Sequence, residues 1–505
     1  MRSRPGQPSA RDVTLSLPEG ATPFNTGRAR QCTSTFVVSD MPVEAIHLAR
    51  GQFALTAVFH ILWPILTISL SAFLLVVEIL WVRTSDVVWY RHARFWGKLL
   101  LLNFAVGVVS GIPMEFQFGT NWGPFSEYTG QFFGNILGFE GAMAFMLEAG
   151  FVGVMMLGWG RVPKGVHLFA TAMVAFGSSL SAFWIMVANS WLQTPAGVTV
   201  VNGKLAVTDY VKAIFNPDMP WGASHMWFAA LETGLVVIAG ISAYHLFKRR
   251  NAEFFVRSFK LALLLLVFIA PVQIWLGDSS GVDVFETQPA KGAAIEGHWQ
   301  TNAPGTGASW SLLAWPDAKK QGNDWSIEVP GLLSLLGTHS LHGQVKGLAD
   351  IPVADQPPML PLLYYTFRAM AGIGFLFMVL AFWTAFAMYK ARGRLDALLA
   401  RRKLLLAWVL AIPLPYIAVE CGWIVREVGR QPWLVYGLMR TENAASNVSA
   451  GAISGSMVMF SCFYVILISS FFIFARKWMR TGPDLALVPP AEPVRPSHAH
   501  ATVDY

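Results

Sequence analysis

One stretch near the C-terminal end, residues 417–433, combines acidic and basic side chains with an apolar run. It reads IAVECGWIVREVGRQPW, so two carboxylates and two arginines end a segment long enough to cross a membrane. Ionisable groups in such a segment are costly to bury and are therefore candidates for function. Glu427 and Arg430 are three residues apart, so one helical face can present both. The pair predicts either a carboxylate held ionised beside a metal centre or a structural Glu–Arg clamp.

Three further side chains inside apolar runs are of types that ligate metals. His60 follows the run QFALTAVF, His225 follows WGAS, and Met370 follows YYTFRA. A lone histidine on an apolar helix is more often a core residue than a ligand, and a lone methionine usually only packs. A histidine and a methionine together are, however, a known axial pair for low-spin haem.

Two acids share one apolar run, in the sequence GFEGAMAFMLE. Glu140 and Glu148 are eight residues apart, which on a helix is a rotation of about 80° beyond two turns and a rise of about 12 Å. Both carboxylates should therefore face roughly the same side, at two depths. The spacing predicts a proton relay, and the alternative is two independent hydrogen bonds between helices.

The composition indicates an integral membrane protein. Of 505 residues, 54% are hydrophobic and 13% are charged, and the mean hydropathy is +0.47. Soluble domains carry roughly 25% charged residues. The net charge of +7 is spread over short connections and forms no contiguous basic face, which argues against nucleic-acid binding. The cysteines, Cys32, Cys421 and Cys462, are too far apart for a metal-ligand motif.

The predicted fold class is an all-α integral membrane protein, since nine apolar runs reach the roughly 20 residues that a bilayer needs. The runs are 53–82, 95–118, 131–158, 167–193, 224–247, 256–277, 362–390, 402–427 and 450–478. We expect residues 1–40 to be a disordered extension, with Met41 as an alternative start, and residues 481–505 to be a disordered tail. Spans 1–6 then occupy residues 41–277, spans 7–9 occupy residues 362–480, and residues 278–361 form a long functional connection.

Basic residues fix the expected orientation. They are concentrated in the connections after spans 1, 3, 5, 7 and 9, while residues 119–130 carry none and residues 195–223 carry only Lys204 and Lys212. By the positive-inside rule the C-terminus is cytoplasmic and the N-terminus lies outside. His60, His225, Met370 and Glu427 then fall in the outer half of the membrane, with Glu148 deeper than Glu140. This distribution predicts redox centres near the outer face that receive protons from the cytoplasm.

Taken together, these motifs resemble subunit I of the cytochrome bd-type quinol oxidases over about residues 41–480. The resemblance rests on QFALTA before His60, on MEFQFGTNW at residues 114–122, on AAIEGHW at residues 293–299, and on GRQPW at residues 429–433. It implies nine helices around three haems: a low-spin haem b, a high-spin haem b, and a haem d or third haem b. The connection 278–361 is shorter than in the long-loop members, so the chain is similar to the short-loop, cyanide-insensitive branch.

The resemblance also implies roles for individual residues. His60 and Glu427 would ligate the two high-spin haems, with Trp423 and Arg430 beside them. His225 and Met370 would ligate the low-spin haem, with Arg368 at its edge. Glu140 and Glu148 match acids of the proton path, and Lys291 and Glu296 match quinol-binding positions, where a solvated surface pair is the alternative.

The implied reaction is oxidation of ubiquinol or menaquinol at the outer face and reduction of dioxygen to water with cytoplasmic protons. Such a reaction is electrogenic without a proton pump. The expected partners are a second oxidase subunit and a small single-helix subunit in a bacterial inner membrane. A haem–copper oxidase is one alternative, but 11 scattered histidines do not supply a copper site. A proton-coupled secondary transporter that uses Glu140 and Glu148 is the other.

Overall fold

The computed structural model describes residues 43–490. The predicted N-terminal extension, and residues 491–505 of the predicted tail, lie outside the described residues.

Within residues 43–490, nine helices are long and apolar enough to cross a membrane, which confirms the predicted all-α membrane fold. Seven of the spans are single helices, and the first six of these are α1 (Val43–Thr84), α2 (Val87–Thr120), α5 (Lys164–Gln193), α7 (Met219–Phe247), α8 (Ala252–Thr287) and α11 (Leu360–Lys390). The last span, α15 (Ala450–Thr481), is also a single helix. The other two spans are built from shorter pieces.

The third and eighth spans each contain an irregular turn. The third runs through α3 (Gly123–Phe139), a π-helical turn η1 (Glu140–Phe145) and α4 (Met146–Leu157), so Glu140 lies at the wide turn itself. Such turns are rare and are frequent at functional sites. The eighth divides into α13 (Arg402–Ala411) and α14 (Leu414–Val428). Pro413 lies in the break, where its ring nitrogen has no hydrogen to donate to the preceding turn.

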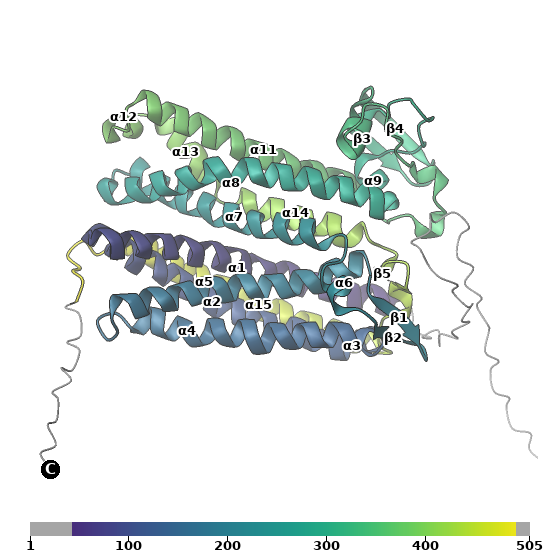
Figure 1. Cartoon of the computed structure of the whole chain (residues 1–505), viewed down its shortest axis with the longest axis horizontal. Coiled ribbons are helices and arrows are strands. Elements are labelled where there is room, and N and C mark those ends of the chain that lie inside the picture. The colour runs from purple at the N-terminus through teal and green to yellow at the C-terminus, as the bar shows by residue number, and fades with distance from the viewer. Residues whose placement is uncertain (1–42, 491–505) are drawn as a thin grey trace, which may run out of the picture.

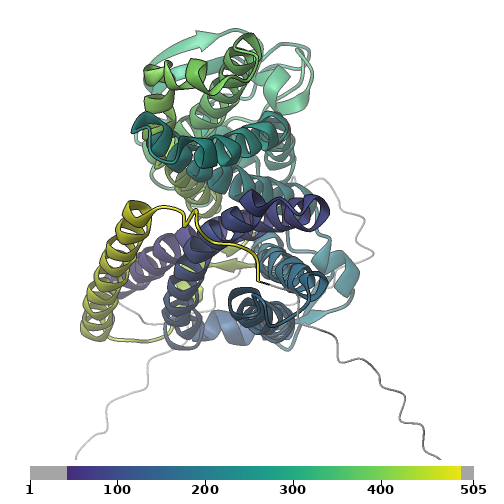
Figure 2. The same ribbon diagram turned by 90° about the vertical axis from the view of Figure 1, so that its left-hand side faces the viewer.

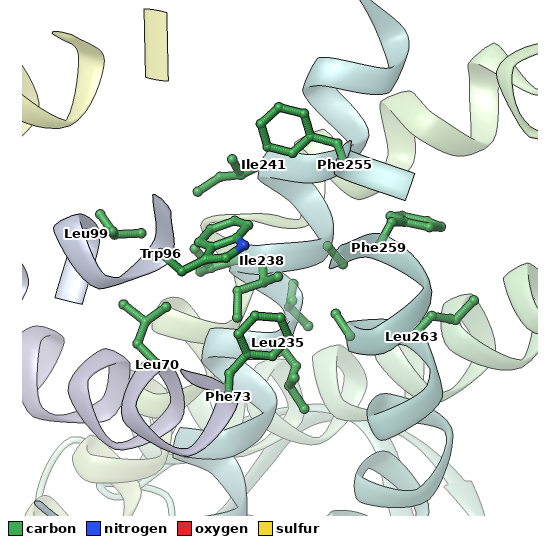
Figure 3. Close-up of a cluster of buried hydrophobic side chains, with 14 of the residues drawn as sticks. Leu70, Phe73, Trp96, Leu99, Leu235, Ile238, Ile241, Phe255, Phe259 and Leu263 are labelled. Atoms are coloured by element: carbon green, nitrogen blue, oxygen red, sulfur yellow. The ribbon is translucent and has the colours of Figure 1, made fainter. Parts of the chain in front are cut away.

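The helices run side by side, with α7 and α8 next to α11, α13 and α14, and with α1 leading into the group of α2, α4 and α5 (Figures 1 and 2). The largest core cluster joins α1, α2, α7 and α8 (Figure 3). Trp96, Phe73 and Phe259 are almost fully buried in it, and the Trp96 indole donates to Ser258 Oγ at 3.1 Å. This packing fixes α7, α8 and α1, which carry several candidate site residues.

Three small antiparallel hairpins modify the all-α expectation. They are β1–β2 (Val198–Val201, Lys204–Val207), β3–β4 (Trp310–Asp317, Gly322–Val329) and β5–β6 (Trp433–Val435, Met439–Arg440). Four short helices complete the connections: α6 (Tyr210–Ile214), α9 (Pro289–Glu296), α10 (Leu332–Thr338) and α12 (Leu395–Leu399). All three hairpins lie with α9 at one end of the bundle, and α12 lies at the other (Figure 1).

The connection predicted for residues 278–361 begins later than expected, because α8 continues to Thr287. The apolar run ends near residue 277, but apolarity marks the hydrocarbon layer and not the end of the helix. Polar side chains such as Asp278 and Asp283 are therefore carried on a helical extension. The remaining connection is ordered around α9 and the β3–β4 hairpin.

Candidate haem, quinol and proton sites

His60 of α1 faces α2 in a close contact. Its Nδ1 lies 2.9 Å from Ser110 Oγ, and Ser110 donates its only proton to the carbonyl of Gly107. Ser110 therefore accepts from His60 Nδ1–H, which leaves the Nε2 lone pair available to a metal. A Cβ at Gly111 would lie 3.0 Å from His60 Cε1, so the ring depends on a glycine beside it.

His225 and Met370 lie on different helices, each against a glycine. His225, in the second turn of α7, faces Gly277 of α8, where a Cβ would lie 3.1 Å from the imidazole. Met370, in the third turn of α11, faces Gly422 of α14, where a Cβ would lie 2.9 Å from Sδ. The absence of two β-carbons lets each side chain pack directly against the facing helix.

Glu427 lies in the last turn of α14 and is held by three donors. Asn189 Nδ2 and Gln193 Nε2 of α5 donate to Oε1 at 2.8 and 3.3 Å, and Arg430 Nη2 donates to Oε2 at 2.5 Å. The carboxylate keeps free lone pairs and is 35% exposed, so it remains able to ligate a metal. Trp423 lies one helical turn earlier on the same face of α14.

Arg430 is only 3% exposed, and two of its guanidinium nitrogens have no partner among the described residues. Nε and Nη1 are both buried and unpaired, while Nη2 binds Glu427. A buried guanidinium with free donors is suited to a further anion. The acidic side chain of a haem fits this requirement.

A second arginine, Arg426, connects Glu427 to an acid that the sequence analysis did not single out. Arg426 forms a buried ion pair with Asp218, which precedes α7. Arg426 Nε also donates to Asn189 Oδ1 at 2.5 Å, and Asn189 in turn donates to Glu427. Asp218, Arg426 and Asn189 therefore form a chain of contacts that orients the Glu427 carboxylate. The only sequence signal was the presence of two arginines in the 417–433 stretch.

Lys291 belongs to the same end of the bundle and is not a surface residue. It is 3% exposed, and its Nζ donates to Gln193 Oε1 at 2.6 Å. A Cβ at Gly429 would lie 2.8 Å from the Lys291 side chain, so α9 packs directly on the end of α14. Burial, followed by the positive charge of Arg426, lowers the pKa of Lys291 to about 7.

Glu296, at the other end of α9, contacts a different group. It is 4% exposed and forms an ion pair with Arg368 of α11 at 2.8 Å. Burial raises the pKa of Glu296, and the neighbouring Arg368 opposes that rise. Arg368 lies two residues before Met370, so α9 contacts the Glu427 side through Lys291 and the Met370 side through Glu296. The alternative of a solvated surface pair is wrong for both residues.

Glu140 and Glu148 both face α5. Ser181 Oγ donates to Glu140 Oε1 at 2.7 Å, while Gly177, one turn away on α5, lies directly against the Glu148 backbone and Cβ. Glu148 is 6% exposed. The Ser181 hydroxyl therefore contacts Glu140, while Glu148 packs one turn away along α5, at Gly177.

Within residues 43–490, no group of three or more His, Cys, Asp or Glu side chains could hold a metal ion on its own. The ligand-type residues instead occur singly on separate helices, which suits cofactors that bring most of their own ligands. Fold and site thus define a polytopic membrane protein whose candidate ligand residues lie on separate helices.

Comparisons with known proteins agree with this class. The family model for cytochrome bd terminal oxidase subunit I matches residues 48–483. The chain is 38% identical over 437 residues to the cytochrome bd ubiquinol oxidase subunit 1 of Bacillus subtilis, covering 83% of this chain and 90% of that protein. It is 33% identical over 509 residues to the cytochrome bd-II ubiquinol oxidase subunit 1 of Escherichia coli, covering 87% and 97%.

A solved structure shows the same fold. The bd oxidase from Geobacillus thermodenitrificans matches with a TM-score of 0.80 and 30% identity, over 87% of this chain and 99% of that one. The chain therefore belongs to the cytochrome bd terminal oxidase subunit I family and is a quinol-oxidising, haem-dependent membrane oxidoreductase subunit. The comparisons favour this function over a proton-coupled transporter.

Proposed function

We propose that this subunit oxidises quinol beside α9 and supports reduction of dioxygen to water between α1, α5 and α14. The observation that carries the proposal is that His60, His225, Met370 and Glu427 each lie between helices, against a glycine or a set of hydrogen-bond donors. Family membership supplies the reaction class.

In this proposal His225 and Met370 hold the low-spin haem b, and His60 and Glu427 hold the two high-spin haems, of which one is haem d or a third haem b. When bound, the haems supply electron transfer and oxygen activation. The chain's own contribution is orientation: Ser110 fixes the His60 ring, and Asn189, Gln193 and Arg430 fix the Glu427 carboxylate. The free donors of Arg430 neutralise acidic haem side chains.

Quinol binds near α9, where Glu296 and Arg368 provide an acceptor and a donor. A quinol hydroxyl needs a base within about 2.6–3.2 Å to lose its proton. Glu296 is buried and bonded to Arg368, so it is held ready in one orientation. Lys291 acts from the other end of α9 by fixing that helix against Gln193 and the end of α14.

Protons for oxygen reduction pass along α4 and α5. Glu148 receives them from the α12 end of the bundle, and Ser181 hands them towards Glu140. Quinol protons are released at the α9 end, which we assign to the outer face. Because protons are released at one face of the membrane and consumed from the other, the reaction separates charge without a proton pump.

The assembled oxidase contains a second large subunit, and we infer a small single-helix subunit as well. The relatives are named as subunit 1 of their enzymes, which implies a counterpart. We also propose that the C-terminus lies in the cytoplasm of a bacterial inner membrane and the N-terminus outside, which the positive residues at the α12 end support.

Removal of the low-spin ligands tests the proposal. His225→Ala and Met370→Leu should each abolish the low-spin haem b band in a reduced-minus-oxidised spectrum, while the protein still inserts into the membrane. Met378→Leu, on the same helix, is the matched control and should keep the band. A normal low-spin spectrum in both ligand variants would show that these residues do not hold the haem.

A further inference from the structure

The β3–β4 hairpin exposes an apolar face that no part of the described chain covers. Along β4, polar Asp324, Ser326 and Glu328 alternate with apolar Trp325, Ile327 and Val329. Alternation with a period of two places the apolar set on one face of the strand. Trp325 is 49% exposed and Ile327 is 55% exposed, so this face is not part of the protein core.

The neighbouring strand extends the same face. Leu313 of β3 pairs with Ile327, so their side chains lie on the same side of the hairpin, and Leu313 is also exposed. We call Leu313, Trp325, Ile327 and Val329 the hairpin patch. Ser311 and Ala314 of β3 are buried instead, which shows that the hairpin already has one face turned towards the protein.

The hairpin is fixed at a definite depth beside α11. The hydroxyls of Tyr364 and Tyr365 donate to the carbonyls of Ser311 and Ala314 at 2.7 and 3.0 Å. Arg368 Nη2 donates to the Ser311 carbonyl at 2.5 Å. Strand β3 therefore lies along the first three turns of α11, next to the α9 end of the bundle (Figure 1).

The length of α11 is expected to place these turns at the level of lipid headgroups. The helix has 31 residues and ends at Lys390. About 20 residues cross the hydrocarbon layer, so about ten at the Leu360 end extend beyond it. Leu362, in the first turn, is exposed, so an apolar side chain of α11 is free to meet lipid at this level. The ring centroids of Trp315 and Tyr365 are 5.8 Å apart, so the exposed indole connects the hairpin to the surface of α11.

We propose that the hairpin patch docks onto the membrane surface, with Trp325 and Ile327 inserted among the headgroups beside α11. Tryptophan prefers this layer because its ring is apolar and its N–H is polar. The docked hairpin also supports Arg368, whose guanidinium binds both the β3 backbone and Glu296. Membrane contact would thus hold the quinol site, assigned above, at the depth where a lipid-soluble quinol arrives.

Fluorescence quenching tests the docking and depends on neither haem nor turnover. A nitrobenzoxadiazole label is attached to Ile327→Cys in the complete oxidase, with Cys32, Cys421 and Cys462 replaced by alanine, in phosphatidylcholine vesicles. Lipid carrying a shallow spin label should quench it several-fold more strongly than aqueous iodide does. Ser326→Cys, exposed on the opposite face of the same strand, is the control and should show the reverse preference.

Leu313→Cys provides an independent position on the patch and should behave like Ile327→Cys. Equal quenching at positions 326 and 327 by iodide would overturn the proposal. Protection of position 327 from both quenchers would also overturn it, because a protein partner would then cover the patch. Neither outcome would bear on the proposed function, because that function is tested separately by the haem spectrum.

Discussion

At the scale of single residues, the site depends on buried charges that balance one another. Arg426 and Asp218 are 16% and 4% exposed, and Arg430 and Lys291 are buried beside them. Removing one partner of a buried ion pair leaves a charge without compensation, whereas removing both charges is far less costly. This asymmetry makes the Asp218–Arg426 pair testable.

Arg426→Gln should lower the free energy of unfolding by about 3–5 kcal/mol, because Asp218 then remains buried without its cation. The double variant Asp218→Asn, Arg426→Gln should recover much of that loss. Thermal unfolding of the two variants measures the difference. Equal melting temperatures for the single and the double variant would show that the pair is not the source of stability.

The proposed proton relay depends on the carboxyl group of Glu148. Glu148→Gln keeps the shape and hydrogen bonding of the side chain but cannot carry a proton, so it should slow oxygen uptake with excess quinol by more than tenfold while all haems are retained. Glu127→Gln is the control. The Glu127 side chain is 69% exposed and forms a surface ion pair with Lys204. Uptake at the parent rate in Glu148→Gln would mean that protons enter elsewhere.

The sequence predicted Glu427 and Arg430 because their spacing is local. It could not predict Asn189 or Asp218, which are 238 and 208 residues away from their contacts on α14. An asparagine within one apolar helix and an aspartate before another carry no local signal. Only the fold brings Asn189 to Glu427 and Asp218 to Arg426.

At the scale of helices, apolar run length predicted all nine spans but not their irregularities. The break at Pro413 follows from the proline itself, whereas the π-turn at Glu140 and the continuation of α8 to Thr287 leave no mark in the apolar pattern. The β3–β4 strands were not predicted either, although residues 324–329 alternate polar and apolar side chains, because the pairing of the two strands and their contacts with α11 appear only in the fold. Close glycine contacts between helices, such as Gly422 with Met370, were likewise beyond reach of the sequence.

Gly422→Ala tests such a contact. The added Cβ would lie 2.9 Å from Met370 Sδ, closer than real β-carbons come to their neighbours, so the methionine must move. We expect a shifted or weakened low-spin haem band. Gly374→Ala on α11 is the control, because a Cβ there meets nothing within 4 Å. An unchanged band in Gly422→Ala would remove Met370 from the ligand pair.

At the scale of the whole molecule, the two ends of the bundle differ in charge and in structure. The α12 end carries Lys248, Arg249 and Arg250 after α7, and further basic residues between α11 and α13. The α9 end carries the hairpins, the proposed quinol site and the ligand-type residues. By the positive-inside rule we therefore expect the α12 end on the cytoplasmic side, with the proposed quinol oxidation outside and proton uptake inside.

This orientation can be measured with one label at each end, in the cysteine-free background used above. Lys319→Cys lies in the turn between β3 and β4, and Arg392→Cys lies between α11 and α12, where both native side chains are exposed. In intact spheroplasts a membrane-impermeant maleimide should label position 319 readily and position 392 only after the membrane is opened. The physical reason is that transferring the basic α12 end across the membrane during insertion is unfavourable. The reverse labelling pattern would place quinol oxidation on the cytoplasmic side, and the proposed charge separation would then be wrong.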